Sequence, residues 1–206
     1  MADTSSSGSR TGLIIGAVGG LVVLLLVAAV MFGSEEVGAE YGEPEISGTA
    51  LTLFPNSESI DFTAAGQVAP DVLGKNFDDS VVTITNDGKA KAIVFLAHWC
   101  SHCQAEVPRV QQWLDETGGV EGVDMYSVST AINSGRTNYP ASTWLDNENW
   151  TVPVIVDDKD SSVLTAYGSG GFPYWVFLNA DGTVAVRTAG ELSIAQLEEI
   201  LNTLEQ

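Results

Sequence analysis

The stretch AIVFLAHWCSHC, residues 92–103, decides how this chain folds and what chemistry it carries. Its first six residues are apolar and predict a strand that is buried on both faces of a sheet. Cys100 and Cys103 are the only two cysteines of the chain, and they lie where a helix is predicted to begin. A chain with no other thiols does not use disulfides as structural cross-links. Two thiols in a Cys-x-x-Cys at a strand-to-helix junction can form and break a bond with each other, and so exchange disulfides with a partner.

Half of a metal site is the alternative interpretation of the two cysteines. A tetrahedral zinc site takes four ligands, and a second Cys-x-x-Cys is missing from this sequence. The only histidines, His98 and His102, lie in the same short stretch as the cysteines. The sequence therefore favours a redox-active Cys100–Cys103 disulfide with no metal and no other cofactor. A metal-binding or haem-binding module stays open as the alternative.

The chain is strongly acidic. Its 206 residues carry a formal net charge of −19, and 26 Asp and Glu stand against 7 Lys and Arg after residue 33. Such a surface repels the phosphates of nucleic acids and anionic lipid headgroups, so nucleic acid is excluded as a partner. The length allows one domain of about 140–150 residues together with additional segments.

The N-terminal segment predicts a membrane anchor. Residues 13–32 contain no charge, and as a helix they would span about 30 Å, the thickness of the hydrocarbon core of a bilayer. We therefore expect a transmembrane helix over residues 13–33. The tail before it, residues 1–12, carries Arg10, and no Lys or Arg follows the span before Lys75. This asymmetry places the tail in the cytoplasm and the body outside it.

A cleaved signal peptide is the alternative to a retained anchor. The apolar part of a signal peptide is usually about 7–15 residues long, which is shorter than this one. Both interpretations put the two cysteines outside the cytoplasm, where disulfide chemistry persists.

The rest of the chain divides into a linker and one domain. Residues 34–59 are rich in Gly, Pro and Glu and are expected to form a flexible acidic linker. In residues 60–206 strands alternate with helices, which predicts an α/β fold with a central mixed β-sheet flanked by helices. The expected strands are residues 81–85, 90–97, 123–130, 152–156, 174–179 and 183–188, and the expected helices are residues 100–116, 142–147, 161–167 and 193–204.

Three stretches of this domain carry a specific resemblance. They are Ala69-Pro70-Asp71, the segment FLAHWCSHCQAEVP (95–108) with its Trp-Cys-x-x-Cys-x-x-Glu-x-Pro pattern, and residues 167–182 with Gly-Phe-Pro-Tyr and an Asp-Gly turn. On these residues the domain resembles the TlpA-like branch of the thioredoxin-fold superfamily, which contains membrane-tethered or exported thiol–disulfide oxidoreductases. The resemblance implies a thioredoxin-like fold and a cis Pro173 that packs across from the two cysteines.

The two cysteines have different expected roles. Cys100 begins a helix, where free backbone N–H groups and the positive end of the helix dipole favour its thiolate, so it is the predicted nucleophile. Cys103 lies one turn further into the helix and should be less exposed. It is therefore predicted to resolve the mixed disulfide that Cys100 forms with a partner.

Three neighbours are predicted to tune this pair. A protonated His102 would stabilise the Cys100 thiolate and make the disulfide more oxidising, unless it is an exposed loop residue without effect. The resemblance assigns Glu106 to tuning or proton relay, with a solvated helix residue as the alternative. Thioredoxin has a buried aspartate where this chain has Val94, so Glu106 is its candidate replacement. Trp99 is expected either to shield the active-site surface or to pack at the end of the strand.

The resemblance also implies a substrate-binding segment at Phe172, Pro173 and Tyr174. The backbone of Phe172 would pair with an extended substrate. Tyr174, where threonine is frequent in the family, would make the groove more aromatic. A trans proline in an ordinary turn is the alternative for Pro173.

The expected function is that of a membrane-tethered protein thiol–disulfide oxidoreductase acting outside the cytoplasm on cysteine-containing proteins. As a reductant it would keep exported proteins or apocytochromes reduced, as in cytochrome c maturation, with electrons from a membrane donor. As an oxidant it would insert disulfides and pass electrons to a membrane acceptor. The fold and Glu106 favour the reductant, and His102 favours the oxidant. A peroxidase of the peroxiredoxin type is disfavoured because Ala97 stands where that chemistry takes a threonine.

Overall fold

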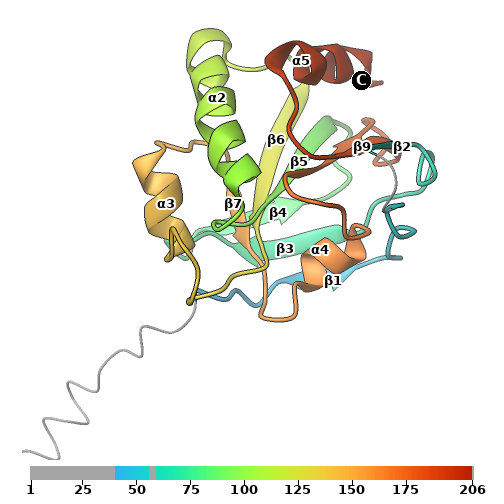
Figure 1. Cartoon of the computed structure of the whole chain (residues 1–206). Helices are drawn as coiled ribbons and strands as arrows, with labels where there is room; N and C mark the ends of the chain where they lie inside the picture. Colours follow the sequence, from blue (N-terminus) through green and yellow to red (C-terminus); the bar gives the residue numbers. More distant parts are fainter. Residues whose placement is uncertain (1–39, 56–58, 206) are drawn as a thin grey trace, which may run out of the picture. The chain divides into compact units, whose positions relative to one another are not determined.

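The computed structural model describes residues 40–55 and 59–205. The predicted tail, the predicted transmembrane helix and the first part of the predicted linker lie outside these residues. In the described part of the chain, no helix is long and apolar enough to cross a membrane. The described residues belong to one compact unit, which is drawn in colour in Figure 1.

A mixed sheet of six strands forms the centre of this unit. Its strands, in the order in which they lie side by side, are β2 (Ile60–Asp61), β9 (Val184–Ala189), β8 (Tyr174–Leu178), β5 (Ala90–Leu96), β6 (Val123–Ser129) and β7 (Val154–Val156). Strands β5, β6 and β7 run parallel, and β8 is antiparallel to both β5 and β9. The predicted α/β fold with a central mixed sheet is therefore confirmed.

Helices cover both faces of the central sheet. They are α2 (Ser101–Thr117), α3 (Ala141–Asn147), α4 (Ser162–Ala166) and α5 (Ile194–Thr203). Alternate residues of β5 face opposite cores. Ala92 and Val94 pack in a cluster with side chains of α2, α3 and α5, and Ile93 and Phe95 pack in a second cluster with side chains of α4. Figure 1 shows α2 and α5 on one side of the sheet and α4 on the other, which explains why the sequence of β5 is continuously apolar.

A second, antiparallel sheet contains part of the predicted linker. Its strands are β1 (Glu45–Ser47), β3 (Asp71–Lys75) and β4 (Val81–Ile84), in the order β1-β3-β4. After β1, the side chains of Leu51 and Phe54 are buried in the core. The Leu51 N–H donates to the carbonyl of Ala166 at 2.8 Å, and the Phe54 N–H to that of Gly168 at 2.7 Å. The prediction of a flexible linker is therefore wrong for residues 40–55, because their pairing partners lie far away in the sequence and no local apolar pattern reveals them.

A buried ion pair joins β2 to β9 and to this N-terminal segment. Nε of Arg187 donates to Oδ2 of Asp61 at 2.9 Å, and both side chains are buried. Nη1 of Arg187 also donates to the carbonyl oxygens of Thr52 at 2.7 Å and Tyr167 at 3.3 Å. Burial opposes ionisation of Asp61, but hydrogen bonds from Thr63 and Arg187 outweigh it and hold the pKa of Asp61 below its ordinary value.

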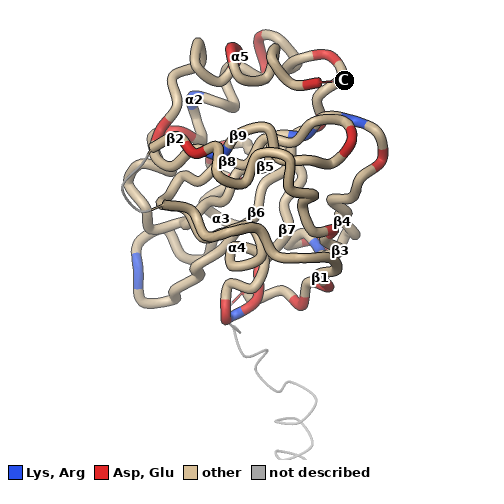
Figure 2. Tube along the Cα trace, turned by 90° about the vertical axis from the view of Figure 1, so that its right-hand side faces the viewer, with Lys and Arg blue, Asp and Glu red and all other residues tan. Residues whose placement is uncertain are grey.

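Acidic residues, red in Figure 2, are spread over turns, loops and α5 of the unit. Of the basic residues, Lys75, Lys89 and Lys91 each pair with an aspartate. Their positive charge is therefore balanced locally, and the surface stays predominantly acidic, as the composition predicts.

Candidate active site

The two cysteines lie at the start of α2, just after β5. Cys100 is the N-cap residue of the helix, with extended backbone angles (φ −79°, ψ 120°), and it is half-buried. Cys103, in the first turn of the helix, is completely buried. Both thiols are free. The predicted nucleophile is thus the more accessible thiol of the two.

The surroundings of Cys103 keep its thiol protonated. Burial raises its pKa well above the ordinary value, and the neighbouring Cys100 and the charge of Glu106 act in the same direction. A buried, protonated thiol does not attack disulfides in solution, because the thiolate is the nucleophile. The resolving role predicted for Cys103 therefore requires that this thiol be activated within the site.

The loop before β8 lies against Cys100. The peptide bond between Phe172 and Pro173 is cis, as the resemblance implies. Sγ of Cys100 lies 3.7 Å from the carbonyl oxygen of Phe172. Phe172 is half-buried and precedes β8, which begins at Tyr174, so its backbone is not part of the β8 ladder.

Trp99 connects this loop to a second one. Its indole Nε1 donates to the carbonyl of Ala131 at 2.8 Å, and its ring meets that of Phe172 edge-on, with the centroids 6.1 Å apart. The guanidinium carbon of Arg136 lies 4.6 Å from the centroid of the Trp99 ring, which is a cation–π contact. The half-buried Trp99 therefore packs between the loops and also borders the surface beside Cys100. Arg136 was not predicted as a site residue, since no local motif marks it.

The prediction that the side chain of Tyr174 lines a substrate groove is wrong. The side chain is completely buried in the core, where its ring packs against Phe54 and Phe95 with centroids 5.5 and 5.4 Å apart. Its hydroxyl donates to the carbonyl of Tyr167 at 2.7 Å. As the first residue of β8, Tyr174 faces the core by strand alternation, which the family pattern alone does not reveal.

We expect Tyr174→Phe to lower the free energy of unfolding by about 0.5–1.5 kcal/mol, the usual contribution of one buried hydrogen bond. The reactivity of Cys100 toward a disulfide should not change, because only a core hydroxyl is removed. Denaturant titration and an exchange assay measure the two effects. Tyr41→Phe is the control, since the side chain of Tyr41 is 43% exposed and its hydroxyl donates only a long hydrogen bond of 3.4 Å to the carbonyl of Ile132. If Tyr174→Phe slowed disulfide exchange without changing the free energy of unfolding, the side chain of Tyr174 would have to contribute to substrate binding after all.

Glu106 is buried inside the site and is not a solvated helix residue. Its Oε1 accepts from the indole Nε1 of Trp175 at 2.6 Å, and its Oε2 accepts from the Leu192 N–H at 2.9 Å and from Nη2 of Arg109 at 3.1 Å. Burial raises the pKa of Glu106 above its ordinary value, although these three partners act in the opposite direction. Both carboxylate oxygens thus accept hydrogen bonds, and the charge of Glu106 contributes to the raised pKa of Cys103.

We expect Glu106→Gln to cost about 1–3 kcal/mol of stability in acid, because the amide group leaves one buried donor without an acceptor. The difference in the free energy of unfolding between the wild type and Glu106→Gln should become smaller as the pH rises from 4.5, the ordinary pKa of a glutamate. Above that value the wild type progressively loses stability, since its folded state holds on to a proton that the unfolded chain releases. Denaturant titrations of both proteins across this range measure the trend. A difference that widens with pH would contradict the raised pKa.

His98 is a structural residue. Its Nδ1 lies 2.7 Å from the carbonyl oxygen of Thr137, and its Nε2 accepts from the Asn133 N–H at 3.2 Å. A neutral ring with the proton on Nδ1 satisfies both contacts. Over residues 40–55 and 59–205, no group of three His, Cys, Asp or Glu side chains is arranged to hold a metal ion.

The side chain of His102 is exposed but contacts a carboxylate. Its Nδ1 lies 2.7 Å from Oε1 of Glu191, and 66% of its side chain is accessible. Oε2 of Glu191 lies 3.2 Å from Nη1 of Arg109. A chain of contacts therefore runs from His102 to the buried Glu106. Neither Glu191 nor Arg109 was predicted as a site residue, because Glu191 is 89 positions from His102 and meets it only in the fold.

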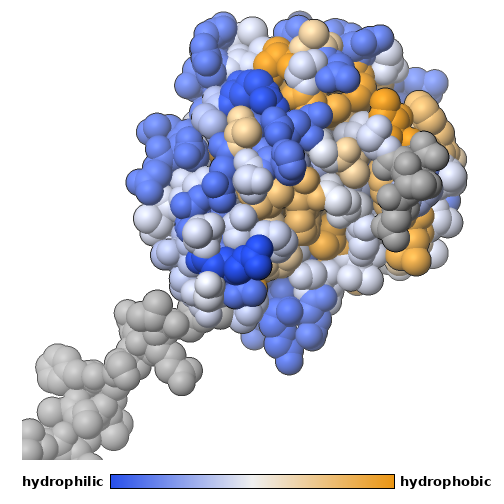
Figure 3. Space-filling model, in the orientation of Figure 1, coloured by the Kyte–Doolittle hydropathy of each residue, from blue (hydrophilic) through white to orange (hydrophobic). Residues whose placement is uncertain are grey.

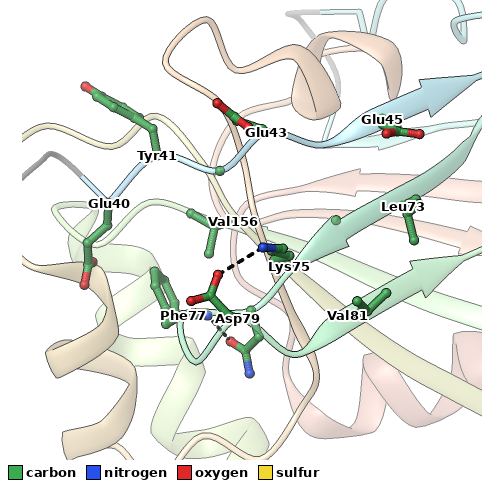
Figure 4. Close-up of a pocket in the computed structure, with 13 residues that line it drawn as sticks. Glu40, Tyr41, Glu43, Glu45, Leu73, Lys75, Phe77, Asp79, Val81 and Val156 are labelled. Atoms are coloured by element: carbon green, nitrogen blue, oxygen red, sulfur yellow. Dashed lines mark hydrogen bonds and ion pairs between the residues drawn. The ribbon is translucent and has the colours of Figure 1, made fainter.

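The cysteine site lies at the surface, where Cys100 is half-buried. Among the residues that the structure describes, the large apolar side chains that remain exposed all come from the first part of the unit and not from α2: Tyr41, Leu53, Ile60, Phe62, Val68, Leu73 and Val81. Figure 3 shows mostly hydrophilic side chains on the part of the surface where α2 and α3 lie. A pocket of about 580 Å³ lies between residues 40–45 and the β3–β4 hairpin (Figure 4), and no residue of the cysteine site lines it. An open surface beside Cys100 suits a protein chain better than a small molecule.

Known proteins share this architecture. Residues 77–205 match a family described as the thioredoxin-like domain. The thiol–disulfide oxidoreductase ResA of Oceanobacillus iheyensis is 29% identical over 144 residues, which cover 68% of this chain and 72% of that protein. The sporulation thiol–disulfide oxidoreductase A of Bacillus subtilis is 24% identical over 127 residues, which cover 62% of this chain and 75% of that protein.

A solved structure agrees with this fold. The crystal structure of a DsbF homologue from Corynebacterium diphtheriae matches with a TM-score of 0.60 and 17% identity. The match covers 76% of this chain and 100% of that one. At this identity the likeness shows the fold alone.

Proposed function

Because the chain belongs to the thioredoxin-like domain family, we propose that it is a protein thiol–disulfide oxidoreductase that works through Cys100 and Cys103. The asymmetry of the two thiols carries the proposal. Cys100 is accessible at the start of α2 and faces the carbonyl of Phe172, while Cys103 is buried one turn further along. The relatives named as thiol–disulfide oxidoreductases support the same chemistry.

The reductive reaction proceeds in two exchanges. The Cys100 thiolate attacks one sulfur of a substrate disulfide, forms a mixed disulfide and releases the other sulfur as a thiolate, which takes up a proton. Cys103 then loses its proton and attacks Sγ of Cys100, which releases the second substrate thiol. Two electrons have passed to the substrate, and the Cys100–Cys103 disulfide must be reduced by a dithiol donor before the next cycle.

An extended segment of the substrate would lie along Phe172. The backbone of this residue lies outside the β8 ladder and next to Cys100, and a cis bond joins it to the buried Pro173. Trp99 and Phe172 offer apolar contact beside the reacting sulfur. The proposed substrates are cysteine-containing exported proteins, apocytochromes among them, which would bind here as extended segments.

The proposed location is the cell membrane, with residues 13–33 as the anchor and the domain outside the cytoplasm. The uncharged stretch and the lack of basic residues from there to Lys75 support this orientation. The electrons would then come from a membrane donor. A thiol reagent that cannot cross membranes should label Cys100 in intact cells, and labelling only after lysis would overturn the orientation.

The reduction potential of the Cys100–Cys103 pair tests the proposed function. Full-length protein is equilibrated in thiol–disulfide buffers, and the fraction of dithiol is read by alkylation and mass spectrometry. A potential at or below about −250 mV is expected of a reductant, whereas a value above about −180 mV would make the protein an oxidant that inserts disulfides. Failure to form a reversible disulfide would overturn the redox function.

A further inference from the structure

The histidine inside the Cys-x-x-Cys motif favours an oxidising pair, whereas the residues that surround it in the fold favour a reducing one. A free imidazolium at His102 would stabilise the Cys100 thiolate, and with it the reduced form, so the pair would be a stronger oxidant. We propose that Glu191 is a positioning residue that holds the ring of His102 and cancels its charge, so that the pair is more reducing than its Ser-His dipeptide predicts. This inference rests on the proposed function, and it names a residue that favours reduction over oxidation of substrate disulfides.

The backbone of the loop after β9 places Glu191 at the site. Gly190 has φ +93°, a left-handed conformation that favours glycine, and it turns the chain away from β9. The N–H of Gly190 donates to the carbonyl of Pro173 at 2.9 Å. The position of Glu191 is therefore coupled to the same cis-proline segment that faces Cys100.

Side-chain contacts fix the carboxylate of Glu191 from both sides. Oε1 lies 2.7 Å from Nδ1 of His102, and Oε2 lies 3.2 Å from Nη1 of Arg109. Arg109 is itself held, because Nη2 donates to the carbonyl of Leu192 at 3.0 Å and to Oε2 of Glu106 at 3.1 Å. Hydrogen bonding by His102, followed by the effect of Arg109, keeps the pKa of Glu191 below its ordinary value, so this carboxylate is charged at neutral pH.

Glu191 acts on Cys100 through the protonated form of His102. The charge of a protonated ring is balanced by a carboxylate 2.7 Å away, so this ring stabilises the Cys100 thiolate less than a free imidazolium would. Reduction of the disulfide takes up two electrons and one proton when Cys100 ends as a thiolate and Cys103 as a thiol. A less stabilised Cys100 thiolate makes that uptake less favourable, which corresponds to a lower potential.

A double-mutant cycle on the full-length protein tests this inference. Glu191→Gln is expected to shift the thiol–disulfide equilibrium about fivefold toward the dithiol, the upper range for an exposed ion pair, which equals about 20 mV upward for a two-electron couple. The shift should disappear when His102→Gln is added. Glu199→Gln on the exposed face of α5 removes the same charge far from the motif and should leave the potential unchanged.

Three results would overturn the inference. An unchanged potential in Glu191→Gln would mean that the carboxylate does not act on the pair. An equal shift with and without His102→Gln would mean that Glu191 acts by another route, such as Arg109. A wild-type protein that forms no reversible disulfide would overturn the proposed function together with this inference. That result can be told apart from the other two, because it is seen in the wild type and needs no variant.

Discussion

Cys100→Ser should reduce disulfide exchange by the protein to the rate seen without protein, while Cys103→Ala should stop the reaction halfway and accumulate a mixed disulfide with the substrate. The first variant has no accessible thiol, since Cys103 is buried and protonated. The second keeps the attacking thiolate but has no sulfur to resolve the intermediate. Incubation with a disulfide-bonded protein, acid quenching and mass spectrometry separate the two results.

The substitutions are chosen to keep the fold. Serine is a favoured N-cap residue, so Cys100→Ser preserves the start of α2. Alanine at position 103 avoids burying a hydroxyl without a partner. Ser101→Ala, at an exposed neighbouring position, is the control and should exchange as the wild type does. Exchange by Cys100→Ser through Cys103 would contradict the assignment of the nucleophile.

Arg187→Met should lower the free energy of unfolding by about 3–5 kcal/mol, which is the cost of leaving a buried charge without its partner. The variant leaves Asp61 buried and unpaired, and the carbonyl of Thr52 loses its donor. Because the ion pair also ties β2 and the segment around Thr52 to β9, protease cleavage before residue 61 should become faster than in the wild type. Denaturant titration measures the first effect and limited proteolysis the second.

An exposed ion pair provides the control for this loss. Lys75→Met removes a cation from Asp79 at the surface, where the pair contributes at most about 1 kcal/mol. The double variant Asp61→Leu, Arg187→Met removes both buried charges and should regain much of the stability. In acid the loss in Arg187→Met should shrink, because the contribution of Asp61 to wild-type stability disappears as the pH falls through its lowered pKa. A loss below 1 kcal/mol at neutral pH would show that the pair does not hold the segment.

Local sequence patterns were sufficient for the central part of the fold and for the two cysteines. The apolar run of β5 predicts a strand buried on both faces, and the helix that follows places Cys100 at its start, because both features depend on neighbours within one turn or one strand. The cis bond before Pro173 followed from the family pattern. The transmembrane helix over residues 13–33 and the location of the domain remain predictions.

The tertiary structure decided the features that need partners from distant parts of the chain. Residues 40–55 lack a local pattern. They join the domain because β1 pairs with β3, and because Leu51 and Phe54 are buried in the same cluster as side chains of α4. The side chain of Tyr174 faces the core because of its register in β8.

The same distinction applies to the site itself. The Cys-x-x-Cys motif by itself was sufficient to place the candidate site, because the thiols, the strand and the helix start are contiguous in the sequence. The balance of charge around it was decided by Glu191 and Arg109, which reach His102 and Glu106 only through the fold. Electrostatic interactions depend on distance in space and not on separation along the chain, so the charges that surround the candidate site are a property of the folded structure.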